Sequence, residues 1–101
     1  MNCGLAPEAI ARIHSVFVRF PAVEKAILYG SRAKGNFKTG SDIDLTLHGE
    51  KLTTQELGVI ADELDELLLP YTIDLSIFHL IDSSELREHI ERVGQVFYEK
   101  G

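Results

Sequence analysis

Cysteine, long apolar runs and basic residues are all scarce in this sequence, and each shortage excludes a class of protein. Cys3 is the single cysteine among 101 residues, which excludes an internal disulfide framework and a zinc site built from cysteines. A lone thiol fits a reducing compartment, so we expect a cytoplasmic protein. No apolar stretch approaches the roughly 18 residues of a transmembrane helix. Met1 to Phe20 lack the basic start and unbroken apolar run of a signal peptide.

Basic residues are outnumbered by acidic ones, 10 against 16, for a net charge of -6. This balance argues against a free-standing binder of nucleic acid, so we expect no direct DNA or RNA binding. The charge is uneven, because residues 1–50 carry a net +1 and residues 51–101 a net -7. Three bases, Arg32, Lys34 and Lys38, lie within seven positions. They fit either a loop that binds a small anion or an ordinary solvated loop.

The sequence has the composition of one small globular domain, which we assign to residues 1–101. Apolar residues make up 45% and charged residues 26% of the chain, as is typical of soluble domains. Apolar spacings of three and four predict helices, and strict alternation predicts strands. Together they predict an α/β (α+β) fold, a small sheet of three to four strands flanked by helices.

The predicted elements follow one another in a simple order. A helix from Pro7 to Phe20, stopped by Pro21, is followed by a buried strand 23–29, a loop with a helical turn 31–41 and an alternating strand 42–48. The next helix is capped by Thr53 and Glu56 and ended by Pro70, and an alternating strand 72–78 follows it. The last elements are a helix capped by Asp82 and Glu85 that runs to about Val93, and a candidate short strand 96–98.

The residues that carry chemistry surround the first loop. Gly30 and Ser31 end a strand and enter a turn, where a glycine allows close approach of a ligand and free backbone N–H groups can bind phosphate. Asp42 and Asp44 are two apart on a strand, so both carboxylates leave the same face. Either feature alone is more often a plain turn or a solvated strand edge.

A third acid favours a functional interpretation of the aspartate pair over that of a solvated strand edge. Asp74 lies on the next predicted strand, on the face that carries Thr72 and Ser76. If the two strands pair, Asp74 meets Asp42 and Asp44. Three converging carboxylates can hold two metal ions, an arrangement that activates an attacking oxygen and steadies a leaving oxygen in phosphoryl displacement. Mg²⁺ prefers such hard oxygen ligands.

These residues together resemble a known family. The combination is Gly30-Ser31, ten intervening residues, Asp42-x-Asp44 and a distant acid, Asp74. It is similar to the minimal nucleotidyltransferases (MNT) of the polymerase-beta superfamily, which are often encoded beside a HEPN-domain partner. The resemblance covers nearly the whole chain and implies a polymerase-beta-like core with a small mixed sheet.

The resemblance implies a role for each matching residue. Gly30 and Ser31 would contact the β- and γ-phosphates of a nucleoside triphosphate, and Asp42 and Asp44 would ligate two Mg²⁺ ions. Asp74 would ligate the catalytic metal and help to deprotonate the acceptor hydroxyl. Two interpretations stay open for Arg32 and Lys34. They would either neutralise the charge of the triphosphate or lie in solvent on the loop.

The small size of the chain bears on the acceptor. Larger relatives add a second domain that shapes the acceptor site, and we expect none in this chain. The resemblance implies an antitoxin that transfers AMP from ATP to a HEPN-type ribonuclease toxin, commonly on a tyrosine. Two alternatives stay open: a non-catalytic module that neutralises its partner by binding, and a transferase to a small molecule such as an aminoglycoside.

The histidines and tyrosines form no motif of this kind. The four histidines show no close metal-ligand spacing, although His48 and His79 directly follow the two strands that carry the acids and so could lie near them. Tyr29, Tyr71 and Tyr98 are interpreted as core or strand-edge residues.

Overall fold

The computed structural model describes residues 4–35 and 42–101. Cys3 and Lys38 lie outside the described residues. The elements in chain order are α1 (Pro7–Val18), β1 (Lys25–Tyr29), α2 (Ser31–Lys34), β2 (Ile43–His48), α3 (Thr54–Asp65), β3 (Ile73–Ile77), the 3₁₀ turn η1 (Phe78–Leu80), α4 (Ser84–Val93) and β4 (Gln95–Glu99).

The four strands form one mixed sheet in the order β3-β2-β1-β4. β1 is antiparallel to both β2 and β4, whereas β2 and β3 are parallel and joined through α3. Parallel neighbours need such a crossover, and a helix is the usual connection. The predicted fold class, a small mixed sheet flanked by helices, is confirmed.

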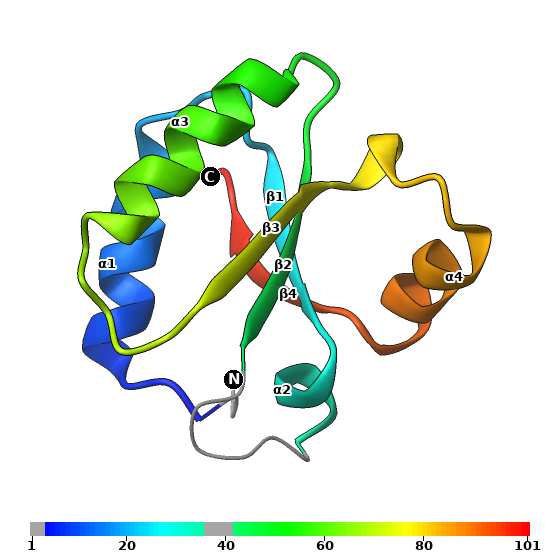
Figure 1. Ribbon diagram of the computed structural model, residues 1–101, viewed down its shortest axis with the longest axis horizontal. Helices are drawn as coiled ribbons and strands as arrows, with labels where there is room; N and C mark the ends of the chain where they lie inside the picture. Colours follow the sequence, from blue (N-terminus) through cyan, green and yellow to red (C-terminus); the bar gives the residue numbers. More distant parts are fainter. Residues whose placement is uncertain (1–3, 36–41) are drawn as a thin grey trace.

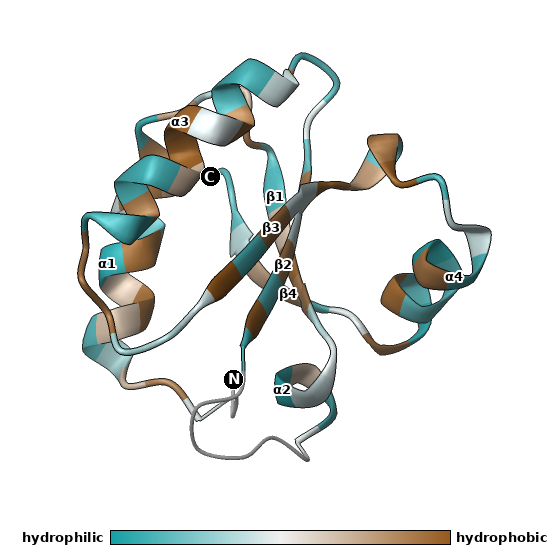
Figure 2. Ribbon diagram, in the orientation of Figure 1, coloured by the Kyte–Doolittle hydropathy of each residue, from teal (hydrophilic) through white to brown (hydrophobic). Residues whose placement is uncertain are grey.

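The helices lie on both sides of the sheet. Figure 1 shows α1 and α3 together on one side, and α4 on the other. Figure 2 shows apolar residues along the central strands and on the helices that cover them. α1, α3 and the strands contribute most of the large side chains that are fully buried in the core, among them Ile13, Phe17, Leu28, Ile43, Leu45, Leu47 and Ile60.

Two predicted helices end earlier than expected. α1 ends at Val18, before Pro21, and α3 ends at Asp65 instead of reaching Pro70. After α3 the chain turns at Leu68, whose φ of 54° is left-handed and 88% of whose surface is exposed. Leu67 and Leu69, on either side of this turn, still pack against the core as partly buried residues, so the chain covers the core here without helix.

The caps of the helices follow the predicted chemistry with one correction. Thr53 caps α3 by accepting a hydrogen bond from the Glu56 N–H at 3.1 Å, as predicted. The predicted cap at Asp82 is wrong, because the hydroxyl of Ser83 accepts from the Leu86 N–H at 3.1 Å. Both residues are good cap formers, and spacing alone did not separate neighbours.

The first three strands are shorter than predicted by one or two residues, and the last strand is longer. β1 begins at Lys25, because Val23 still belongs to a turn in which its N–H donates to the Phe20 carbonyl at 2.9 Å. β3 ends at Ile77, where η1 begins, and the candidate last strand extends over Gln95–Glu99.

Among the residues that the structure describes, no helix is both long and apolar enough to cross a bilayer.

Candidate functional site

The two strand acids meet at one end of the sheet. Asp44 on β2 stands opposite Asp74 on the parallel strand β3 and opposite Tyr29, the last residue of β1. Cross-strand partners share a face, so these three side chains form one row on the same side of the sheet. The strand pairing on which the sequence argument depended is therefore present.

Gly30 closes the row at the end of β1. Its φ of 77° and ψ of -155° lie in a region that is essentially restricted to glycine. A Cβ at this position would overlap the Asp44 Oδ2 atom and lie 3.3 Å from its Cγ. The Asp44 carboxylate thus packs against the bare backbone of Gly30, which brings the glycine turn and the acid pair into contact.

α2 begins directly after this glycine. The helix spans Ser31–Lys34, and no side chain caps its first turn. The first N–H groups of a helix have no carbonyl partner within the helix. Ser31 therefore contributes both a backbone N–H and a hydroxyl beside the acids, where an anionic group of a ligand could be bound.

The two bases of α2 differ in their surroundings. Arg32 is only 2% exposed, and its guanidinium lies 5.1 Å from the centre of the Tyr71 ring. It is therefore not the solvated loop residue of one reading, and it ties α2 to the segment that precedes β3. Lys34 is exposed, so its side chain is accessible to a ligand.

The acids repel one another. Burial raises the pKa of the Asp44 carboxyl above its ordinary value of 3.8, and the charges of Asp74 and then Asp42 raise it further. Asp42 is exposed and lies just before β2. Like charges held together in this way are relieved by a bound cation.

The chemistry of these donors fits Mg²⁺. Within residues 4–35 and 42–101, no three His, Cys, Asp or Glu side chains converge closely enough to enclose an ion. Mg²⁺, however, usually keeps waters and takes only one or two carboxylates together with substrate phosphates. Asp44 and Asp74, opposite each other in register, provide such a pair beside the Gly30–Ser31 turn.

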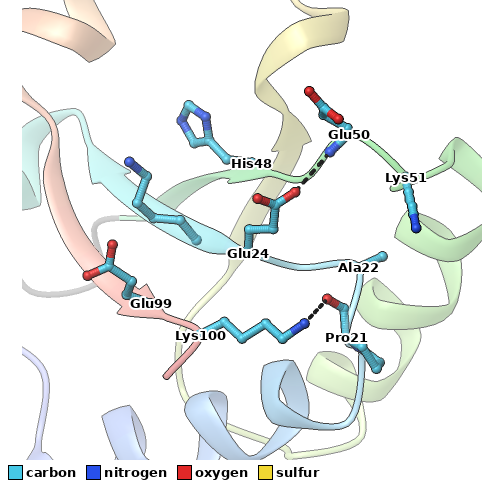
Figure 3. A pocket seen from close by; sticks show the side chains of 9 residues that line it. Pro21, Ala22, Glu24, His48, Glu50, Lys51, Glu99 and Lys100 are labelled. Carbon is cyan, nitrogen blue, oxygen red and sulfur yellow. Dashed lines mark hydrogen bonds between the residues drawn. The ribbon is translucent and has the colours of Figure 1, made fainter.

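His48 and His79 lie away from the acids. His48 ends β2, four residues from Asp44, and stacks on Phe78 with ring centres 4.6 Å apart. It lines a hollow of about 780 Å³ at the other end of the sheet, which none of the predicted site residues lines. Figure 3 shows this hollow, in which Glu24 accepts a hydrogen bond from the Glu50 backbone. The idea that a histidine joins the acid site is wrong for both.

One residue of the site was missed by the sequence analysis. Tyr29 was interpreted as a core or strand-edge residue, and its ring is indeed 8% exposed. Its place opposite Asp44 also puts it in the row of acids. Its position immediately before the Gly-Ser turn was the available signal, but the apolar segment 23–29 shows no alternation that would assign its face.

Comparison with known proteins gives the family. The family model described as polymerase beta, nucleotidyltransferase matches residues 11–101. The chain belongs to this nucleotidyltransferase family. It therefore contains a nucleotidyltransferase domain, and the Gly30, Asp44 and Asp74 constellation lies within the matched residues. Among the curated proteins, none matches the chain.

Solved structures share the fold at low sequence identity. A toxin-antitoxin crystal structure with AMP-PNP matches at 21% identity and a TM-score of 0.72, over 95% of this chain and 75% of the other. A tri-AMPylated Shewanella oneidensis HEPN toxin in complex with MNT antitoxin matches at 18% identity and a TM-score of 0.67, over 92% and 71%. The toxin-antitoxin MntA-HepT matches at 18% and 0.69, over 94% and 74%.

Proposed function

We propose that this nucleotidyltransferase transfers AMP from ATP to a hydroxyl of a partner protein, a HEPN-type toxin, and thereby acts as its antitoxin. The observation that carries the proposal is the position of Asp44, opposite Asp74 in the parallel pair and packed against Gly30. Family membership supports the transferase chemistry. The partner is supported by similar structures described as complexes of a HEPN toxin with an MNT antitoxin.

The residues divide the work of binding the nucleotide. In the proposal, Gly30 and Ser31 hold the β- and γ-phosphates at the start of α2, where backbone N–H groups point toward the ligand. Lys34 adds positive charge from the exposed side of the same helix. Arg32 acts from its buried place beside Tyr71. It sets the position of the loop and lends charge to the phosphates.

The acids divide the work of the transfer. Asp44 and Asp74, with the exposed Asp42 beside them, would hold Mg²⁺ together with the phosphates, and the cations would neutralise the charge of the triphosphate. The acceptor hydroxyl oxygen forms a bond to the α-phosphorus while the bond to the bridging β-phosphate oxygen breaks. Asp74 receives the hydroxyl proton, and pyrophosphate leaves. Asp44, which packs against Gly30, orients the attacked phosphate.

The proposal is tested by labelling. The purified chain is incubated with Mg²⁺ and ATP labelled at the α-phosphate in an extract of the source cells. We expect one protein band that carries α-label but no label from γ-labelled ATP. The band should be absent with Asp44→Asn and present with Asp82→Asn, a matched change of an exposed aspartate outside the site. Mass spectrometry of the band should identify a HEPN protein that carries AMP.

Other results would redirect the proposal. If none of the four nucleotides labels a protein, transfer to a protein partner is wrong. If Asp44→Asn still neutralises the partner in cells, the chain acts as a binding module. Labelling of a small molecule instead of a protein would identify a small-molecule acceptor.

A further inference from the structure

α2 is too short to hold its own orientation. It is a single turn, Ser31–Lys34, closed by the Lys34 N–H bonded to the Gly30 carbonyl at 3.2 Å and by the Gly35 N–H bonded to the Ser31 carbonyl. Isolated helices of fewer than about 12 residues are marginal in water. Figure 1 shows α2 as a short coil at the end of β1. The place of the Gly30–Ser31 turn that begins it therefore depends on contacts with other elements.

Contacts from distant parts of the chain fasten α2 to the fold. The Ala33 side chain is 8% exposed and belongs to the core, and the Arg32 guanidinium lies over the Tyr71 ring. A further contact comes from β4, where the Gln95 Nε2 atom donates to the Ala33 carbonyl at 2.8 Å across 62 positions of sequence. The last carbonyls of a helix have no partner within the helix. Gln95 therefore satisfies a group that α2 itself cannot.

The backbone of Gln95 is firmly placed. It is the first residue of β4 and stands opposite Leu28 on β1. Gly94, directly before it, packs so closely that a Cβ there would overlap the Ile27 Cγ2 atom of β1 and the Ile90 carbonyl oxygen. The Gly94 N–H also donates to that carbonyl at 2.7 Å. The amide of Gln95 thus reaches α2 from a point fixed against β1, the strand that ends in the glycine turn.

The effect of this hydrogen bond is local. Gln95 as a residue is exposed, so replacing its side chain removes little burial from the core. Its bond to Ala33 is part-buried, and a hydrogen bond away from bulk solvent is stronger than one in water. Loss of the bond should therefore loosen α2 and leave the rest of the fold in place.

We propose that Gln95 is a positioning residue, whose side-chain amide fixes α2, and with it the Gly30–Ser31 turn, against the sheet. This inference rests on the proposed function, in which that turn holds the β- and γ-phosphates. Gln95 itself acts through the Ala33 carbonyl, so its part in the reaction is to keep the phosphate-binding turn in place before ATP arrives.

The test compares two exposed glutamines. Gln95→Met removes the donor and keeps the length of the side chain. Gln55→Met makes the same change in the first turn of α3, on a residue that is also exposed. The readouts are kcat and KM for ATP in the transfer reaction, ATP affinity by calorimetry with Mg²⁺, the melting temperature, and hydrogen exchange of the Lys34 and Gly35 amides by NMR.

We expect Gln95→Met to weaken ATP affinity and to raise KM for ATP by about three- to tenfold, as for the loss of one hydrogen bond. Its kcat should stay within about twofold of that of Gln55→Met, because a contact made equally in the bound substrate and the transition state changes KM alone. The Lys34 and Gly35 amides should exchange faster in Gln95→Met, with a melting temperature close to that of Gln55→Met.

Other outcomes separate this inference from the function on which it rests. Wild-type ATP affinity in Gln95→Met, with an active parent chain, would overturn the inference and leave the proposed function intact. A melting temperature well below that of Gln55→Met, or a fall in kcat at unchanged KM, would also overturn it. A parent chain that binds ATP without transfer would overturn the function, and the affinity and exchange comparisons would still decide the role of Gln95. A parent chain that does not bind ATP would overturn both.

Discussion

At the level of single residues, Gly30 is the position least open to change. Gly30→Ala places a Cβ against the Asp44 carboxylate and forces alanine to a φ of 77°. We expect a loss of about 1–3 kcal/mol in the free energy of unfolding from the backbone alone, and loss of nucleotide binding because Asp44 must move. Chemical denaturation and ATP binding by calorimetry measure the two effects.

Gly35 supplies the matched control for this change. Its φ of 82° is also left-handed, but a Cβ there meets nothing within 4 Å. Gly35→Ala should therefore cost about 1–2 kcal/mol of stability and retain ATP binding. Equal ATP affinities in the two variants would show that the contact between Gly30 and Asp44 does not shape the site.

Removal of the Asp44 charge should raise the stability of the fold and lower the transfer activity. Its raised pKa means that the folded state binds the proton more tightly than the unfolded state. Ionisation at neutral pH therefore destabilises the fold. Asp44→Asn should raise the melting temperature at pH 7 in metal-free buffer, by a gain in unfolding free energy below about 1 kcal/mol because the group is partly exposed. It should reduce transfer about 100-fold or more.

The pH dependence distinguishes this explanation from a general effect of the substitution. The stability gain of Asp44→Asn should shrink as the pH falls toward 3.8, because the wild-type carboxyl, whose pKa is raised above that ordinary value, takes up its proton over this range. A melting temperature of Asp44→Asn that is at or below wild type at pH 7 would contradict repulsion among the acids.

At the level of elements, the helix caps offer the sharpest test. The Ser83 hydroxyl, and not the Asp82 carboxylate, accepts the Leu86 N–H at the start of α4. Ser83→Ala should lower the free energy of unfolding by about 1 kcal/mol, and Asp82→Ala should change it by less than about 0.5 kcal/mol. Urea denaturation of both variants measures the difference, and the reverse order would restore Asp82 as the cap.

The sequence predicted elements wherever a repeating pattern matched a buried face. The alternation around Leu45 and Leu75 predicted both strands that carry the acids, and the cap at Thr53 began α3 where expected. The spacing of the motif also identifies Gly30, Asp44 and Asp74 from the sequence alone. Ends of helices were harder, because tertiary packing decides how far an apolar pattern such as that of α3 continues.

Burial and side-chain direction could not be predicted from the sequence. The sequence placed Arg32 on a loop, yet its guanidinium is buried over the Tyr71 ring. Tyr29 was interpreted as a core or strand-edge residue, yet it stands opposite Asp44. Both depend on contacts between segments far apart in the chain, in the first case between α2 and the start of β3, and local patterns carry no record of such contacts.

For the whole molecule, the sheet separates two regions. The acid row lies at the end where β1 stops and β2 and β3 begin, and the hollow around His48 lies at the other end. Changes around His48 should therefore alter the stability of the fold without altering the transfer reaction. The titration of His48 provides a way to examine this separation.

Burial lowers the pKa of His48 below its ordinary value of 6.5, and the neighbouring Lys25 charge lowers it further, while Glu24 and Glu91 oppose the change. The folded state then binds this proton less tightly than the unfolded state, so stability is lost as the pH falls below 6.5. His48→Gln removes that loss. Its melting temperature should fall less than that of the wild type between pH 7.5 and pH 5.5, with kcat and KM for ATP unchanged at pH 7.5. If the melting temperatures of the two proteins fall equally between pH 7.5 and pH 5.5, His48 titrates equally in the folded and unfolded chains. A changed kcat would show that the two ends of the sheet are coupled.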